Sequence, residues 1–261
     1  MRKDSLDLLL CPRCQKGGLR AESSAVEIHF GPLICRSCGA TFAIIDGVAD
    51  FLGNDAPRRL DRLIETDLVA RQYERSIRPR IAARLGAPAP DIDSEYLLYR
   101  SLLAARPLAP VLDLNAGPAI FARRLAMEKA HGPTFALDRY RSMLEEGAVQ
   151  IREHQQSVDL VRAQVPPLPF RTGVLGGILQ VGSLGHAASL DRHLFEVARV
   201  LARRARFVAT VVVSTRFLPR LGLWGRSYSE RDLRDRAAEA GLVRFERLQL
   251  EGRMVFKVEK P

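Results

Sequence analysis

The sequence predicts an α/β protein whose parallel sheet is preceded by a small metal-binding module. Two observations predict this fold class. All four cysteines of the 261-residue chain lie within its first 38 residues, and from Val111 onwards short apolar runs alternate with amphipathic helical patterns. We expect three parts: residues 1–52 form the metal-binding module, residues 53–106 form a helical linker or lid, and residues 107–261 form the main α/β domain.

The composition is that of a globular protein. Hydrophobic residues make up 47% of the chain and charged residues 27%, which excludes a disordered or collagen-like protein. No uninterrupted apolar stretch reaches the roughly 18 residues of a membrane-spanning helix, and we find no signal peptide. We therefore expect a cytoplasmic protein without a membrane span. The net charge of +10 admits a nucleic-acid partner, but no run of five basic residues occurs, and scattered basic residues are typical of a solvated surface.

The four cysteines form two Cys-x-x-Cys pairs, Cys11 with Cys14 and Cys35 with Cys38, separated by 20 residues. This spacing is typical of a zinc ribbon, in which four thiolates enclose a tetrahedral metal. Gly39 follows the second pair and frees the backbone to turn around the metal. A rubredoxin-like iron centre uses the same ligands, and two disulfides would need an oxidising compartment. Zinc is the favoured metal, and a closed four-thiolate site makes it structural rather than catalytic.

Further patterns in the first 106 residues predict two strands and two helices. The strands are Val26–Phe30 and Thr41–Ile45, and the helices are Arg58–Leu85 and a second one that ends near Ala105. Asp93 or Ser94 is the expected cap of the second helix. A helical segment in this position either covers a ligand pocket or packs as a plain linker, and the pattern allows both.

The main domain begins with a strand, a turn and a helix that together are typical of a nucleotide pocket. Val111–Leu114 is a buried-strand run, Asn-Ala-Gly-Pro-Ala follows it, and a helical pattern covers Ile120–Lys129. Such a turn directs free backbone N–H groups and a positive helix dipole at the ligand. The next strand, Thr134–Asp138, ends in an acid. A carboxylate in this place can accept hydrogen bonds from both ribose hydroxyls of an adenosyl ligand.

These motifs resemble those of a known family. VLDLNAGPAIFARRLA resembles the first motif of the class I S-adenosylmethionine-dependent methyltransferases, ALDRYRSMLEEG the second, LVRAQVPPLPF the third, and ILQVGSLGH the strand and loop that follow. The resemblance implies a Rossmann-like, doubly wound, seven-stranded methyltransferase sheet and S-adenosylmethionine as cofactor. CRSCGATFAIIDGVADFL resembles the zinc ribbon at the N-terminus of several bacterial and plastid methyltransferases. With Tyr73-Glu74 and Arg78-Pro79, it is similar to a subgroup related to ubiquinone-type C-methyltransferases.

The resemblance assigns eight residues to the cofactor, namely Asp113, Asn115, Gly117, Ala119, Asp138, Tyr140, Gln164 and Val165. The motif is degenerate, because Asn115 and Ala119 replace the first and last of three family glycines. Asn115 can still adopt a left-handed conformation. Gln164 stands where the family has an acid that contacts the adenine amino group, and its side-chain carbonyl can accept the same bond. Arg203-Arg204-Ala205 replaces a Pro-Gly-Gly turn, so a left-handed position there must be met in another way.

The chemistry implied by the resemblance is methyl transfer by in-line displacement, for which a protein mainly supplies proximity and orientation. His186 matches a family position that faces the substrate and is the candidate base. Trp224 lies where the family builds a substrate lid. The favoured function is methylation of a small molecule, such as an apolar or natural-product acceptor. Two alternatives stay open: an inactive methyltransferase-like binding or assembly factor, and an RNA methyltransferase.

Overall fold

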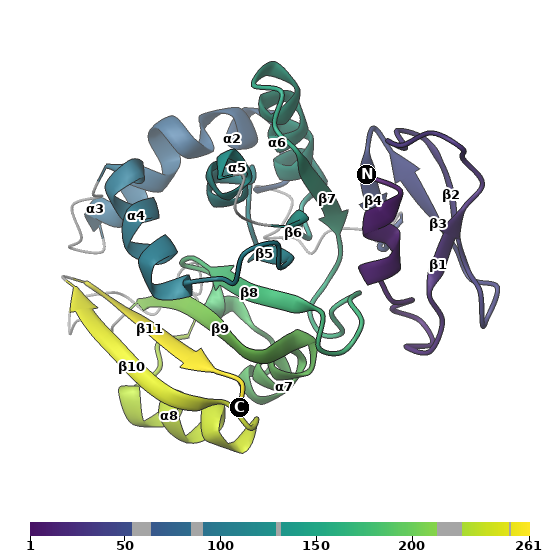
Figure 1. The fold of residues 1–261 in the computed structure, drawn as a ribbon. Coiled ribbons are helices and arrows are strands. Elements are labelled where there is room, and N and C mark those ends of the chain that lie inside the picture. The colour runs from purple at the N-terminus through teal and green to yellow at the C-terminus, as the bar shows by residue number, and fades with distance from the viewer. Residues whose placement is uncertain (54–63, 85–90, 129–131, 213–225, 251) are drawn as a thin grey trace.

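The computed structural model describes residues 1–53, 64–84, 91–128, 132–212, 226–250 and 252–261. Eleven strands in these segments form one sheet, in the order β1-β2-β3-β4-β7-β6-β5-β8-β9-β11-β10 (Figure 1). The strands are β1 Leu19–Ala21, β2 Gly31–Cys35, β3 Thr41–Ile45, β4 Val48–Asp50, β5 Val111–Leu114, β6 Thr134–Asp138, β7 Val158–Arg162, β8 Leu175–Gln180, β9 Leu201–Val212, β10 Val243–Leu250 and β11 Arg253–Glu259.

Helices cover both faces of the sheet. They are the short η1 Asp4–Leu8, α2 Asp67–Gln72, the π-helical turn η2 Tyr73–Ile77, α3 Arg78–Arg84, α4 Ile92–Leu103, α5 Ile120–Met127, α6 Arg141–Glu153, η3 Leu184–His186, α7 Leu190–Val200 and α8 Glu230–Glu239. Helices α4, α5 and α6 lie on one face, and α7 and α8 lie on the other (Figure 1). Within the described ranges, none of the helices has both the length and the apolar character that a membrane crossing requires.

The seven strands from β7 to β10 confirm the expected methyltransferase-type sheet. Strands β7, β6, β5, β8 and β9 are parallel, and β11 returns antiparallel between β9 and β10. Every residue of β5 and β6 is buried, as expected for parallel strands with helices on both faces. Leu112 and Phe135 point into the core under α7 and α8, whereas Val111 packs with residues of α4 and α5.

The N-terminal module continues this sheet instead of forming a separate layer. Strand β4 pairs in parallel with β7, with Val48 opposite Leu160 and Asp50 opposite Arg162. Leu9 and Phe170 are fully buried and belong to one hydrophobic core cluster that spans the module and the main sheet. The cysteine module therefore shares both hydrogen bonds and core with the main domain.

Two of the expected N-terminal elements differ from the structure. Residues 26–30 do not form a regular strand, because their pairing is limited to one isolated antiparallel bridge between Glu27 and Arg2. Around this bridge the Val26 carbonyl accepts the Lys3 N–H, and Ile28 exchanges hydrogen bonds with Met1. Val26 and Phe30 are 78% and 68% exposed. The strand that pairs with β3 is Gly31–Cys35. The other expected strand, Thr41–Ile45, is confirmed as β3.

The first linker helix is interrupted where the sequence pattern predicts one continuous helix, because Glu65 and Thr66 are not helical. Residues 54–63 lie outside the described part of the chain, and after them α2 begins at Asp67 with Thr66 as its cap, because the Thr66 side chain accepts a hydrogen bond from the Val69 N–H. Asp91, and not Asp93 or Ser94, caps α4, since its carboxylate accepts the N–H groups of both those residues. Helix α4 ends at Leu103, and α5 ends at Met127 within the described residues.

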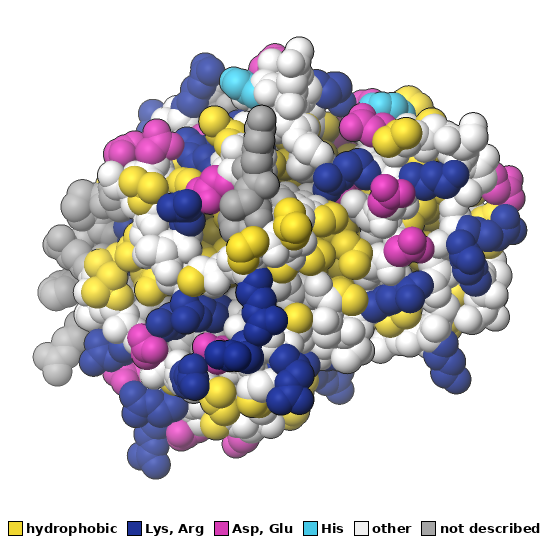
Figure 2. Space-filling model, viewed as in Figure 1, with side chains coloured by type: hydrophobic (Ala, Val, Ile, Leu, Met, Phe, Trp, Pro, Cys, Tyr) yellow, Lys and Arg dark blue, Asp and Glu magenta, His cyan; other side chains and the backbone are white. Residues whose placement is uncertain are grey.

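The surface carries a basic cavity near the C-terminal strands. In Figure 2, Lys and Arg side chains gather in the lower half of the molecule. A cavity of about 340 Å³ is lined by Ala104, Arg106, Arg204, Arg206, Arg244 and Glu259. Arg204 has a φ of +62°, so it supplies by itself the left-handed position that a Pro-Gly-Gly turn would provide. Tertiary structure thus assembles four arginines that are scattered along the sequence.

Candidate cofactor site and metal centre

The turn between β5 and α5 has the shape expected of a cofactor loop. Asn115, Gly117 and Ala119 have φ values of +57°, +55° and +58°. Three alternate residues therefore adopt the left-handed conformation that glycine enters most easily. The prediction for Asn115 is confirmed, whereas the same conformation at Ala119 was not foreseen. A left-handed alanine costs about 1–2 kcal/mol, so the surrounding structure holds the turn in this form.

Asp138 joins this turn at the end of the neighbouring strand. Its Oδ2 accepts a hydrogen bond from the Gly117 N–H at 2.8 Å, and its Oδ1 accepts one from the Tyr140 N–H at 2.9 Å. Burial raises the pKa of Asp138, although three backbone N–H groups act in the opposite direction. The structure thus brings two predicted cofactor residues, Gly117 and Asp138, into direct contact.

Asp113 is buried beneath the turn, on strand β5. It is 1% exposed, and its Oδ2 accepts a hydrogen bond from the Ala122 N–H at 3.0 Å. Burial raises its pKa to about 7. Helix α5 begins at Ile120, and the preceding cap residue, Ala119, makes no side-chain hydrogen bond. Asp113 therefore accepts a hydrogen bond from the first turn of the helix in its place. Its observed contacts therefore support the loop.

A chain of polar side chains holds Asn115 from the other side. The Asn115 and Gln180 side-chain amides both donate to Ser183 Oγ, at 3.2 and 3.1 Å. The Gln180 carbonyl oxygen lies 2.8 Å from His193 Nε2. Burial lowers the pKa of His193 to about 4, so the neutral ring donates its Nε2 proton to Gln180. The sequence gives no signal for these hydrogen bonds, because the residues that make them lie on different elements.

The linker contributes Tyr73 to the same place. A Cβ built on Gly117 would lie 3.5 Å from Tyr73 Cε1, so the phenol ring lies against the cofactor loop. Burial raises the pKa of Tyr73, and the negative charges of Asp138 and Asp113 raise it further. Glu74 forms an ion pair with Arg123 of α5, which secures the π-helical turn to the helix that follows the loop. The Tyr73-Glu74 motif was the signal for this contact, although sequence reasoning did not assign Tyr73 to the site.

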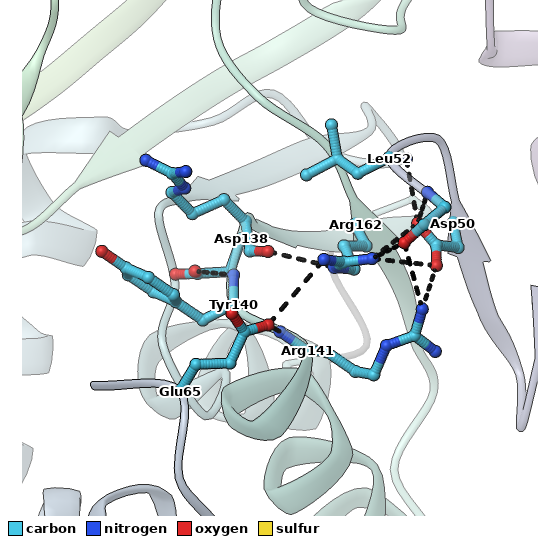
Figure 3. A network of polar contacts seen from close by, with 9 residues as sticks. Asp50, Leu52, Glu65, Asp138, Tyr140, Arg141 and Arg162 are labelled. Carbon is cyan, nitrogen blue, oxygen red and sulfur yellow. Dashed lines mark hydrogen bonds and ion pairs between the residues drawn. The ribbon is translucent and has the colours of Figure 1, made fainter. Parts of the chain in front are cut away.

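The remaining predicted residues lie at the same edge of the sheet, beyond the ends of parallel strands. Gln164 is exposed just after β7, and Val165 is partly buried against the core. The ring of Tyr140 extends away from Arg162 (Figure 3), and the Arg139 guanidinium stacks over it at 5.5 Å. His186 is exposed in the short helical turn after β8. Trp224 lies outside the described residues.

The four cysteines form one cluster. Their sulfur atoms all lie within 4.8 Å of one another, with Cys11 and Cys38 at 3.8 Å and Cys14 and Cys35 at 3.7 Å. A tetrahedral zinc with Zn–S bonds of about 2.3 Å requires sulfur separations of about 3.8 Å, so the sulfur geometry fits this metal.

The backbone around the cluster also fits a metal centre. Gly39 has a φ of +70°, as its place after the second pair predicted. A Cβ on Gly17 would lie 2.6 Å from Cys35 Sγ, so only glycine allows this close approach. The N–H groups of Ser37 and Cys38 point at Cys35 Sγ from 3.4 Å, which favours a thiolate over a thiol.

Comparison with known proteins agrees with this geometry. Residues 112–209 match a protein family described as a methyltransferase domain. Two methyltransferases of Arabidopsis thaliana, both named as uncharacterized and chloroplastic, are similar over almost the whole chain. The first is 22% identical, and the alignment covers 99% of this chain and 79% of the relative. The second is 24% identical, and the alignment covers 97% of this chain and 79% of the relative.

Solved structures share the fold at low sequence identity. A phosphoethanolamine N-methyltransferase 2 of Haemonchus contortus, in complex with S-adenosyl-L-methionine, aligns with a TM-score of 0.64 at 13% identity, over 77% of this chain and 59% of its own. The [4+2]-cyclase SpnF aligns with a TM-score of 0.58 at 16% identity, over 65% and 80%. Because one fold hosts these different reactions, the reaction has to be argued from the site.

Proposed function

We propose that the chain uses the methyltransferase domain matched over residues 112–209 to methylate a small molecule, with S-adenosylmethionine as the methyl donor. The observation that carries the proposal is the backbone of the turn after β5. Asn115 and Ala119 replace two family glycines, yet both keep the left-handed conformation of glycine. A turn that retains a conformation disfavoured by alanine is typical of a functional site. This observation favours a binding-competent loop over an inactive relic.

The residues of the site fit an adenosyl ligand. Asp138 offers carboxylate oxygens for the ribose hydroxyls, and the start of α5 offers a positive dipole. Gln164 offers a side-chain carbonyl for the adenine amino group, beside the apolar Val165. Tyr73 and Tyr140 offer ring surface that excludes water. When bound, S-adenosylmethionine supplies an activated methyl group on a sulfonium, and the protein supplies proximity and orientation.

The acceptor in this proposal is a small molecule, because the similar phosphoethanolamine methyltransferase is named for a small substrate. His186 is the proposed base for an acceptor that must lose a proton, because it lies in the short helical turn η3 that follows β8. The four-cysteine centre is proposed to hold structural zinc, on the basis of its sulfur geometry.

Titration calorimetry of the metal-loaded protein with S-adenosylmethionine and S-adenosylhomocysteine tests the proposal. We expect a dissociation constant in the low micromolar range. Asp138→Asn should weaken binding at least tenfold, about 1.4 kcal/mol, whereas Asp235→Asn on the exposed face of α8 should not change it. No heat of binding up to millimolar ligand, from protein shown to be folded, would favour the binding or assembly factor instead.

The basic cavity supports RNA methylation as a second candidate function. The sequence left this function open but did not favour it, for want of a basic cluster. In the structure, one cavity is lined by four arginines against a single carboxylate, Glu259; the arginines are Arg106, Arg204, Arg206 and Arg244. Arginine guanidinium groups suit phosphate oxygens. Binding of a short RNA should weaken steeply with salt and fall in an Arg204→Gln, Arg244→Gln double variant. Equal binding by wild type and double variant would remove this support.

A further inference from the structure

Three charged residues lie side by side on three neighbouring strands. These strands end at the edge of the sheet where the proposed cofactor residues lie. Asp50 on β4 is opposite Arg162 on β7, and Arg162 is opposite Asp138 on β6. The exposed fractions of the three residues are 3%, 5% and 5%. Strand β4 belongs to the metal-binding module, whereas β6 carries the proposed cofactor carboxylate. One buried arginine therefore separates the module from the cofactor site.

Arg162 contacts both sides at once (Figure 3). Its Nη1 donates to the two oxygens of Asp50 at 3.2 and 3.1 Å and to the Gly53 carbonyl at 2.7 Å. Its Nε donates to the Arg139 carbonyl at 3.1 Å. Arg139 directly follows Asp138 in the chain, so the planar guanidinium links Asp50 to the backbone beside the cofactor carboxylate.

Arg141 and Glu65 make further contacts around residues 139–141. Arg141 Nη2 donates to Asp50 Oδ2 at 2.6 Å, and the Arg141 N–H donates to Glu65 Oε1 at 3.2 Å. Glu65 also lies 3.8 Å from Arg162 Nη2. The two acids balance the two arginines. Residues 139–141, which include the Tyr140 N–H bound to Asp138, are held from two directions by this quartet.

We propose that Asp50 and Arg162 are positioning residues for Asp138, so that the N-terminal module is a working part of the cofactor site. This inference rests on the proposed function, in which Asp138 binds the cofactor. A buried guanidinium that loses its carboxylate moves toward another anion or toward water. Without Asp50, Arg162 turns toward Glu65, its bond to the Arg139 carbonyl is lost, and residues 139–141 loosen.

A second buried carboxylate distinguishes positioning from simple attachment of the module. Asp159, near the other end of β7, accepts hydrogen bonds from the Arg2 backbone and guanidinium and from the Ser5 hydroxyl. It is 1% exposed, and none of these contacts involves residues 139–141. Asp159 therefore attaches the module to the same strand without reaching the cofactor site, which makes it the matched control.

The experiment is calorimetric titration of the full-length, metal-loaded protein with S-adenosylhomocysteine. Asp50→Asn should raise the dissociation constant at least tenfold, and Asp159→Asn should leave it within twofold of wild type, although both lower the melting temperature. A dissociation constant of Asp50→Asn within twofold of wild type would overturn the inference. So would an equal weakening in Asp159→Asn, because attachment alone would then explain the effect.

Amide hydrogen exchange tests the same inference without a ligand. The Tyr140 and Arg141 amides should exchange at least tenfold faster in Asp50→Asn than in Asp159→Asn, and equal rates would overturn the inference. If wild type binds no S-adenosylhomocysteine, the proposed function fails while the exchange rates still decide the positioning role. If Asp50→Asn does not fold, Arg162→Lys replaces it, because an ammonium group cannot reproduce the guanidinium fork that reaches Asp50 and the Arg139 carbonyl together.

Discussion

At the scale of single residues, backbone conformation and burial decide what the cofactor loop can do. Asn115 suits its position for two reasons: it tolerates a φ of +57°, and its side chain donates a hydrogen bond to Ser183. Ala119 has no polar side chain, and backbone hydrogen bonds to Ala116 and Arg123 accompany its conformation. Behind the loop, His193 is kept neutral by burial.

Replacing Asn115 separates its conformation from its hydrogen bond. Asn115→Ala loses both, so we expect the free energy of unfolding to fall by about 2 kcal/mol. Asn115→Gly loses the bond but accepts the left-handed conformation, so the loss should be about half as large. Urea denaturation measures both values. Equal losses would mean that the hydrogen bond alone explains the choice of asparagine.

His193 should make stability depend on pH. The pKa of His193 is lowered by burial to about 4 in the folded protein, from its ordinary value of 6.5. Between these values the unfolded chain binds a proton that the folded protein does not, so stability falls as pH falls through this window and is retained above it. From pH 7 to pH 5 the free energy of unfolding should drop by about 2 kcal/mol more in wild type than in His193→Gln.

The comparison with His193→Gln is needed because Asp113 acts in the opposite direction. Its pKa is raised from 3.8 to about 7, so the folded protein binds a proton between these values that the unfolded chain does not, and stability falls as pH rises. The difference between wild type and His193→Gln removes this shared contribution. A difference that does not change between pH 7 and pH 5 would contradict a buried neutral histidine.

At the scale of elements, the carboxylate of Glu95 connects helix α4 with α3 and β11 through ion pairs. Glu95 is 2% exposed and forms ion pairs with Arg78 of α3 and Arg253 of β11. It also accepts a hydrogen bond from the Tyr99 hydroxyl at 3.0 Å. Arg78 in turn lies 5.4 Å from the centre of the Phe121 ring on α5. Helix α4 thus secures the linker to the helix that follows the cofactor loop.

Glu95→Gln should be strongly destabilising, because it leaves two partly buried guanidinium groups, those of Arg78 and Arg253, without their anion. We expect a loss of about 3–4 kcal/mol in the free energy of unfolding, measured by urea denaturation. The matched control is Glu246→Gln, since Glu246 pairs with Lys257 but is 64% exposed; its loss should stay below about 0.5 kcal/mol. Similar losses in both variants would show that burial of the ion pair is unimportant.

At the scale of the whole molecule, the metal-binding module and the main domain share one sheet and one core. The pairing of β4 with β7 covers what would otherwise be an open strand edge. Leu33 of the module and Phe135 of the main sheet belong to the same buried cluster. The metal should therefore stabilise the whole protein, and its loss should expose an edge prone to aggregation.

Loss of the metal should be measurable in full-length protein. We expect one zinc per chain by elemental analysis, and Cys38→Ser should lower the melting temperature by about 10 °C or more. Cys38 is exposed, so a lost thiolate ligand explains the change better than lost packing. Ser37→Ala is the control and should shift the melting temperature by no more than about 2 °C. A zinc content of zero in folded wild type would contradict the assignment.

Local patterns predicted much of this architecture because they depend on neighbouring residues alone. Cysteine spacing marked the four-cysteine cluster, and the strand-turn-helix pattern after Val111 marked the turn with its left-handed Asn115. The strand expected at Val26–Phe30 was wrong for the opposite reason. Its alternation is strand-like, but in the described residues the segment pairs through a single isolated bridge, between Glu27 and Arg2, and a period-two pattern carries no information about partners.

The sequence by itself determined the α/β class, the four thiolates and the residues at the ends of the parallel strands, because each follows from periodicity or spacing along the chain. Only the tertiary structure decided that β4 extends the main sheet, that Tyr73 lies on the cofactor loop and that Asp50 reaches Arg162. These contacts join residues up to 112 positions apart. Their energy comes from burial of paired charges and apolar surface, which depends on the complete fold.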